Sequence, residues 1–166
     1  MNRVYRAALA GCLVCSCIAA DLGSKALVRE TLADAPAQYY LDGWLRLSHW
    51  ENAGTAMSLG DELPRSLRYL VFTVAAASFA VGLIGFMLIK AAIRPAQLMA
   101  GALIAGGTLS NVFDRLLHDG RALDFINIVA TPLHLMIFNL ADLAIALGAV
   151  LPAISSLHRL MERKGA

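Results

Sequence analysis

Two aspartates, Asp124 and Asp142, place acid groups inside or at the edge of a chain that is otherwise suited to lipid. Asp124 follows a glycine turn at Gly120, and Asp142 stands at the start of a long apolar run. A carboxylate next to hydrocarbon is costly, so an acid at this depth indicates a functional site. Two acids that meet share one proton, which predicts acid–base chemistry.

Further polar residues stand near these acids at helical spacing. Asn111, Asp114 and Arg115 are three and four positions apart, which places all three on one face of a helix. Asn139 and Asp142 are also three apart. A polar stripe on an apolar helix must face the interior of a bundle or a watery cavity. We therefore expect these side chains to meet inside the protein.

A second group of polar residues lies nearer the N-terminus. Asp21 and Lys25 are four apart and can pair on one helix face. Asn52 begins a turn in the main polar segment. Basic residues near the acids are few, and they are Lys25, Arg115 and Arg121. Taken residue by residue, a structural polar plug remains an alternative to a catalytic site.

The composition indicates a membrane protein. The 166 residues are 58% hydrophobic and 16% charged, with a mean hydropathy of +0.64. A spanning helix needs about 20 mostly apolar residues. The sequence predicts an all-α membrane protein with a single domain, residues 1–166, and four transmembrane helices at Val4–Ala20, Leu67–Ile89, Ala96–Leu117 and Leu133–Leu157.

The distribution of charge predicts the orientation. Seven basic residues and one acid flank the helix ends that share a side with the two termini. Basic residues in short loops favour the cytoplasmic side. We therefore expect both termini in the cytoplasm and the polar cluster toward the outer leaflet. The basic residues are Arg3, Arg6, Lys90, Arg94, Arg159, Arg163 and Lys164.

The segment between the first two spans, from about residue 29 to residue 68, is the only extensive polar region. From Trp44 to Trp50, polar and apolar residues alternate in the manner of a strand, after a hairpin signal at Asp42–Gly43. This predicts a small extracytoplasmic β-hairpin or sheet between helices 1 and 2. Glycines in the second and third spans, Gly82 and Gly107 among them, predict close helix packing.

Several chemistries lack a motif in this sequence. It contains no HExxH and no GxSxG, it has no basic stripe for nucleic acid, and its three cysteines, Cys12, Cys15 and Cys17, all fall in the first apolar segment. We expect no metal, no cofactor and no nucleic-acid partner. A water activated by two aspartates is the simplest chemistry left.

The chain resembles the bacterial lipoprotein signal peptidases (signal peptidase II), which are membrane aspartyl peptidases. The resemblance runs through nearly the whole chain in five ordered blocks. It departs from the family pattern at Leu22, Met57, Ser110 and Leu143, and none of these removes a catalytic group. The blocks are Asp21–Lys25, Asn52–Ser58, Gly106–Arg115, Leu123–Phe125 and Phe138–Asp142.

The resemblance implies an aspartic endopeptidase of the bacterial inner membrane. Such an enzyme removes the signal peptide from diacylglyceryl-prolipoproteins, cleaving N-terminal to the lipidated cysteine, and is a target of globomycin. It contacts membrane lipids. The family's catalytic pair matches Asp124 and Asp142. By the same matching, the substrate-binding or orienting residues are Asn52, Gly54, Asn111, Arg115 and Asn139, and the residues that shape the site are Asp21, Lys25 and Asp114.

Two other functions are compatible with acids at membrane depth. A small proton-coupled transporter relays protons through such groups, but the polar residues cluster at one end and no internal repeat is visible. A non-catalytic assembly factor would need only a polar plug. The presence of both acids favours the peptidase over either alternative.

Overall fold

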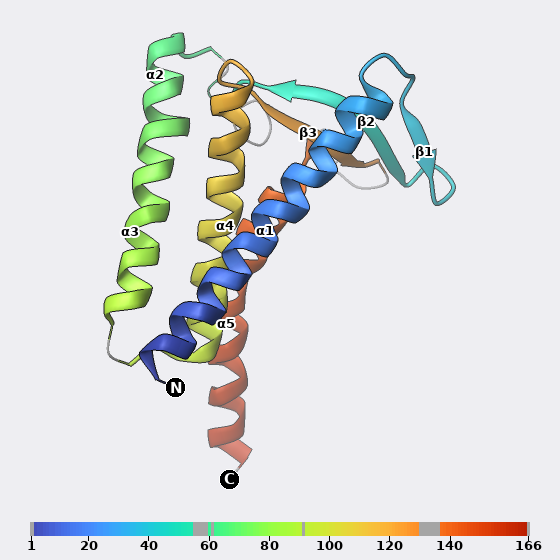
Figure 1. Ribbon diagram of the computed structural model, residues 1–166. Helices are drawn as coiled ribbons and strands as arrows, with labels where there is room; N and C mark the ends of the chain where they lie inside the picture. The colour runs from blue at the N-terminus through green and yellow to red at the C-terminus, as the bar shows by residue number, and fades with distance from the viewer. Residues whose placement is uncertain (1, 55–59, 61, 91, 130–136, 166) are drawn as a thin grey trace.

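The protein is described by a computed structural model that covers residues 2–54, 60, 62–90, 92–129 and 137–165. Within these residues, four helical segments are long and apolar enough to cross a membrane. They are α1 (Arg3–Leu32), the continuous run α2–η2–α3 (Arg65–Ile89), α4 (Pro95–Leu117) and α5, whose described helix is Leu140–Gly165. A small sheet lies at one end of this bundle (Figure 1). The expected fold class is confirmed.

The second span contains a change of helical hydrogen bonding. It begins as α2 (Arg65–Tyr69), continues as the π-helix η2 (Leu70–Ala75) and ends as α3 (Ala76–Ile89). A short π-helical stretch inserted in an α-helix is uncommon and is often found at functional sites. Here it supplies Phe72, which lines the site described below.

The first helix is longer than the expected span Val4–Ala20, since it continues to Leu32. Asp21, Lys25 and Arg29 follow one another at intervals of four, on the side that meets α4. These charged groups are paired inside the protein, so their polarity does not end the helix. The assignment of Arg29 to the polar loop was wrong.

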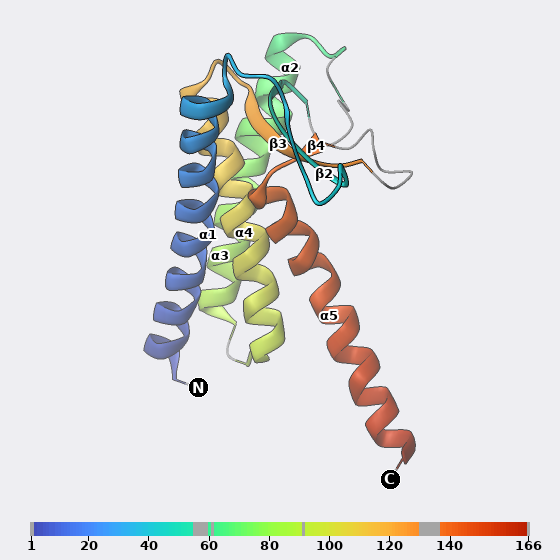
Figure 2. The same ribbon diagram turned by 90° about the vertical axis from the view of Figure 1, so that its right-hand side faces the viewer.

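The last helix begins at Leu140, seven residues after the expected start at Leu133. Ile137 and Phe138 instead form strand β4 and pair with a neighbouring strand. Residues 133–136 lie outside the described part of the chain. Figure 2 shows α5 diverging from the other helices toward the C-terminus.

The sheet is larger than the expected hairpin. Its antiparallel order is β1 (Gln38–Tyr40), β2 (Leu45–Asn52), β3 (Ala122–Ile128) and β4 (Ile137–Phe138). The first two strands form the hairpin that Asp42–Gly43 predicts, with Gly43 at φ +89°. The other two come from the connection between α4 and α5. Pairing with β3 satisfies the second edge of β2, which would otherwise expose unpaired backbone groups.

Helix α4 is the central helix and packs against α1, α3 and α5 (Figure 1). Glycines allow two of these approaches. A Cβ at Gly106 would lie 2.8 Å from the Cβ of Cys17 in α1, and one at Gly148 would lie 2.7 Å from the carbonyl oxygen of Ala100. Gly107 likewise faces Ala141. By contrast, Gly82 and Gly85 of α3 have open space around them, so the expectation of close packing there was wrong.

Replacing Gly148 with alanine should destabilise the fold by about 1–3 kcal/mol, because the added methyl group meets the α4 backbone. Gly82→Ala is the matched control. It should be neutral or gain up to about 1 kcal/mol from helix propensity. Thermal unfolding of the two purified variants in the same detergent checks this. Equal stability of the two variants would contradict the close α4–α5 contact.

Candidate active site

Strand pairing places Asn52 beside Asp124 although 72 positions separate them. In the β2–β3 register Asn52 lies opposite Ala122, and Trp50 lies opposite Asp124. Asn52 and Asp124 are therefore diagonal neighbours, a relation that brings side chains within reach of one another. The Asn52 amide donates to Asp124 Oδ2 at 2.8 Å.

The start of α5 positions Asp142. The Asn139 side chain accepts a hydrogen bond from the Asp142 N–H at 2.9 Å, and the Asp142 carboxyl accepts from the Asn139 N–H at 3.2 Å. This reciprocal pattern is a capping box, which satisfies two backbone donors that a helix start leaves without partners. The cap therefore holds Asp142 in one orientation at the N-terminus of α5.

Amide side chains connect the two acids. The Asn139 amide nitrogen donates to Asp124 Oδ1 at 2.6 Å, so Asn139 contacts both carboxyl groups. Asn111 of α4 donates to Asp142 Oδ1 at 2.9 Å. The side-chain oxygen of Asn111, Oδ1, in turn accepts hydrogen bonds from the Asn139 amide and from the Lys25 ammonium group. Elements β2, β3, α4 and α5 thus meet at this pair of acids.

A layer of buried charge lies behind the amides. The ammonium group of Lys25 contacts Asp21 at 2.7 Å, Asp114 at 3.2 Å and Asn111 at 2.8 Å. Lys25, Asp21 and Asp114 are all 0% exposed. An ammonium group has three donors, and each has an oxygen partner here.

The same two acids hold the backbone immediately before each member of the pair. Asp114 Oδ2 accepts from the N–H of Leu123, the residue before Asp124, at 2.7 Å. Asp21 Oδ1 accepts from the N–H of Ala141, the residue before Asp142, at 2.9 Å. The charged layer therefore fixes both carboxyl-bearing residues through their neighbours.

Three contributors to this layer were missed from the sequence. Arg29 pairs with Asp114 Oδ1 at 2.7 Å, His118 lies 2.9 Å from the same oxygen, and Ser110 donates to Asp21 at 2.7 Å. Arg29 is four positions from Lys25, so a longer first helix would have revealed it. Ser110, one of the departures from the family pattern, makes a buried hydrogen bond. Arg121, expected beside the acids, pairs with Glu51 at the surface.

Arg115 acts on a different part of the site. Its guanidinium donates to the carbonyl oxygen of Gly54 at 2.6 Å and lies 5.7 Å from the ring centre of Phe72. The Gly54 N–H donates to the Asn52 side chain at 2.9 Å. Arg115 and Asn52 thus fix the backbone that follows β2.

All ten residues singled out from the sequence lie in this region. Six of them line a cavity of about 350 Å³: Asn52, Asn111, Arg115, Asp124, Asn139 and Asp142. One wall is polar, with amides and Arg115. The other is apolar and is built from the membrane spans, with Phe72, Ala76, Ile145 and Ala146.

The two acids have no ion-pair partner among the described residues, because Lys25 and Arg29 are engaged by Asp21 and Asp114. Burial raises the pKa of the Asp124 carboxyl to about 6. Hydrogen bonds from Asn52 and Asn139 lower this pKa, whereas the nearby charge of Asp142 raises it further. Asp124 can therefore exchange a proton near neutral pH.

Among the described residues, no group of three or more His, Cys, Asp or Glu side chains is placed to hold a metal ion. The chemistry available from the described side chains is proton transfer by two carboxyl groups on a molecule in the cavity.

Comparison with known proteins identifies the family. The model of the signal peptidase (SPase) II family matches residues 13–158. This chain belongs to that family. The chain is 37% identical to the lipoprotein signal peptidase of Photorhabdus laumondii over 82% of its own length and 80% of the relative. It is 36% identical to that of Cronobacter sakazakii over 84% and 82% of the two chains.

Solved structures share the fold of this chain. Two structures of bacterial membrane enzymes obtained by the in meso method align with TM-scores of 0.75 and 0.77. Their sequence identities are 23% and 21%. The alignments cover 91% and 90% of this chain, and 88% and 93% of the solved chains.

The raised pKa of Asp124 predicts how stability depends on pH. Between the ordinary value of 3.8 and the folded value of about 6, the folded state binds the proton more tightly than the unfolded state. The contribution of Asp124 to stability is present below 3.8 and is lost as the pH rises through 6. The loss is about 3 kcal/mol.

Asp124→Asn removes this titration. The melting temperature of the variant, relative to wild type, should therefore rise between about pH 4 and about pH 6 and stay constant above. Asp119→Asn, at an acid whose side chain is 95% exposed, is the control. Parallel pH profiles for wild type and Asp124→Asn would contradict the buried, proton-binding state of Asp124.

Proposed function

We propose that Asp124 and Asp142 are the catalytic dyad with which this member of the signal peptidase II family removes signal peptides from prolipoproteins. Membership of the family supports the reaction and its aspartic type. The observation that carries the residue assignment is the placement of both carboxyls on one cavity, held by amides and without a cationic partner among the described residues.

The dyad would hydrolyse the peptide bond by proton transfer. Two neighbouring carboxyls that share one proton comprise a base and an acid. The ionised carboxyl removes a proton from water as the water oxygen bonds to the scissile carbonyl carbon. The protonated carboxyl gives its proton to the carbonyl oxygen. The dyad then protonates the amine nitrogen as the carbon–nitrogen bond breaks.

The surrounding residues have separate roles in this proposal. Asn139 and Asn111 orient the carboxyls, and Asn52 binds Asp124 while it supports the Gly54 backbone. Arg115 holds Gly54, whose backbone would face the substrate peptide. Asp21, Lys25 and Asp114 shape the site from behind.

The substrate proposed is a diacylglyceryl-prolipoprotein, cleaved N-terminal to the lipidated cysteine. The apolar wall of the cavity supports this choice, because Phe72, Ala76, Ile145 and Ala146 come from membrane spans and lie beside the carboxyls. Acyl chains on this wall would leave the peptide bond at the polar wall. Globomycin-like cyclic peptides and membrane lipids are proposed as further partners of the same surface.

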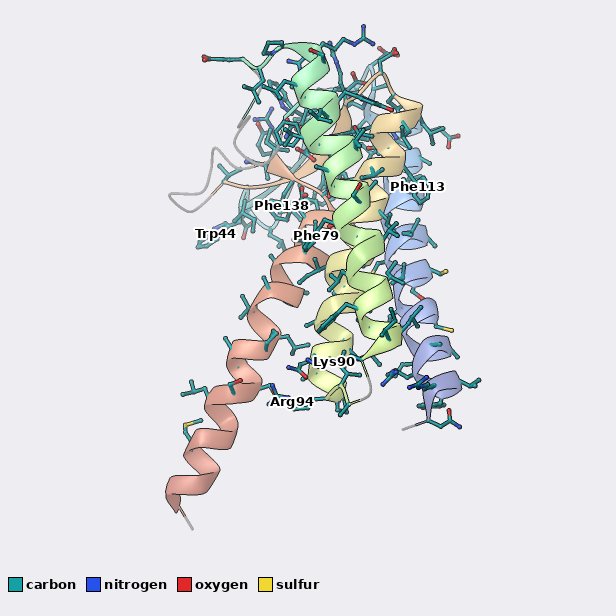
Figure 3. The ribbon with its side chains drawn as sticks, turned by 90° about the vertical axis from the view of Figure 1, so that its left-hand side faces the viewer. Trp44, Phe79, Lys90, Arg94, Phe113 and Phe138 are labelled. Atoms are coloured by element: carbon teal, nitrogen blue, oxygen red, sulfur yellow. The ribbon has the colours of Figure 1, made fainter. Side chains whose placement is uncertain are left out.

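The topology proposed places both termini in the cytoplasm and the dyad toward the periplasmic leaflet of the bacterial inner membrane. Lys90 and Arg94 lie at the end of the bundle away from the sheet, whereas Trp44 lies beside the sheet (Figure 3). Basic residues favour the cytoplasmic side, and tryptophan favours a membrane interface. We also propose that residues 1–166 act as a single peptidase domain.

Replacing either member of the dyad tests the reaction. Asp124→Asn and Asp142→Asn should each lower the rate of prolipoprotein cleavage by about 10³-fold or more, because each removes a proton-transferring group. A gel-shift assay in nanodiscs with a diacylglyceryl-prolipoprotein measures this, with and without EDTA. Asp119→Asn should cleave like wild type, since its side chain is 95% exposed.

EDTA should leave the wild-type rate unchanged. Cleavage that survives in either dyad variant would overturn the assignment of that aspartate. Failure of well-folded wild type to cleave would overturn the proposed substrate, and proton flux in liposomes would then test the transporter alternative.

Acyl-chain binding at the apolar wall is tested separately. Ala146→Phe would fill part of the cavity beside the dyad and should raise the KM for the lipidated substrate by about tenfold or more, since it excludes an acyl chain. Ala149→Phe, at an exposed position of α5 outside the cavity lining, is the matched control. Equal KM values for the two variants would contradict acyl-chain binding at this wall.

A further inference from the structure

We propose that a second pocket, next to the active site, binds the phosphate group of an anionic phospholipid. This pocket has a volume of about 560 Å³ and lies between the start of α2, the end of α4 and the turn before β3. The charged residues that line it are Arg65, Arg68, Arg115, Arg121 and a single acid, Asp119, among the described residues. It therefore has an excess of guanidinium groups, which the proposed cleavage reaction does not use except for Arg115.

Two of these arginines, Arg65 and Arg121, have partners that are easily exchanged. Arg65 lies 3.8 Å from Asp119, and their side chains are 79% and 95% exposed. Arg121 lies 3.3 Å from Glu51, and this pair is also open to solvent. Exposed ion pairs contribute little to stability. A guanidinium binds phosphate through two parallel hydrogen bonds, so a phosphate can replace a surface carboxylate at small cost.

The position of the pocket favours a lipid over a soluble anion. Arg65 begins one membrane span and Leu117 ends another, at the same end of the bundle (Figure 1). The pocket therefore lies at the depth where lipid headgroups meet water. Its wall also contains Tyr69, Leu116 and Leu117, which are 51%, 53% and 72% exposed. A phosphate among the arginines would leave the acyl chains against these apolar side chains.

Arg115 links this pocket to the catalytic cavity, because it lines both. Its guanidinium holds the Gly54 carbonyl at 2.6 Å. A phosphate bound beside Arg115 thus lies next to the group that orients the backbone of the peptidase site. Through this residue, the lipid composition of the membrane would be coupled to the geometry of the active site.

Native mass spectrometry of the full chain in neutral detergent tests the proposal. Phosphatidylglycerol is the anionic probe, phosphatidylcholine the zwitterionic control lipid, and inorganic phosphate the soluble anion. Wild type should bind one phosphatidylglycerol molecule in preference to phosphatidylcholine. Arg65→Gln with Arg68→Gln should weaken that binding about 30-fold, since two basic contacts with an anionic lipid are lost.

The charge-matched control is Arg3→Gln with Lys90→Gln, which removes two positive charges at the opposite end of the bundle. It should bind phosphatidylglycerol like wild type, and Arg121→Gln alone should show an intermediate loss. Equal binding of the two lipids, or equal affinities of the two double variants, would overturn the site. If inorganic phosphate saturates the pocket and blocks lipid binding, the pocket is a site for a soluble anion and the lipid proposal is overturned. This experiment measures lipid binding and not cleavage. Its outcome therefore does not depend on whether the peptidase proposal holds.

Discussion

The site depends on the contacts that the buried ammonium group of Lys25 makes. This group is fully enclosed and bonded to Asp21, Asp114 and Asn111, three residues drawn from α1 and α4. A buried charge is tolerated only where its partners are in place, and removing one partner leaves the others uncompensated. Asp21 and Asp114 pass this constraint on, because each also binds the backbone N–H that precedes one of the dyad acids. The positions of Asp124 and Asp142 are thus fixed by hydrogen bonds to the residue that precedes each of them.

This arrangement separates two kinds of carboxyl in one small volume. Asp21 and Asp114 are paired with Lys25 and Arg29, so their role is structural. Asp124 and Asp142 are bound by the amides of Asn52, Asn111 and Asn139. An amide orients a carboxyl without supplying the full charge that would keep it ionised. The acids with amide partners are therefore the ones suited to hold and release a proton.

Much of the site was predictable from the sequence where helices position it. The spacing of Asn111, Asp114 and Arg115, and of Asn139 and Asp142, placed these residues on common faces, and the structure brings them together. The contact between Asn52 and Asp124 was not predictable from spacing, since it depends on the register of strands far apart in the chain. Family resemblance, and not periodicity, assigned Asn52 to the site.

The two errors at the first helix have a shared physical cause. A charged residue in an apolar run was taken to end the membrane span, so α1 was cut short and Arg29 was assigned to a loop. In the structure Arg29 has a buried partner, Asp114, contributed by another helix. Likewise, Leu123 and Phe125 of β3 pack with Val28 and Leu32 at the end of α1. Such long-range partners decide where α1 ends and where a strand forms, and a single sequence does not show them.

The central claim is that Asp124 is a buried acid, oriented by amide hydrogen bonds, that holds an exchangeable proton. Infrared spectroscopy tests this claim most directly. The difference spectrum between wild type and Asp124→Asn isolates the carbonyl stretch of the protonated carboxyl. The account predicts that this band is present at about pH 5, where an ordinary aspartate is ionised, and disappears as the pH rises through about 6. A band that titrates near 3.8, the ordinary value, would contradict the account.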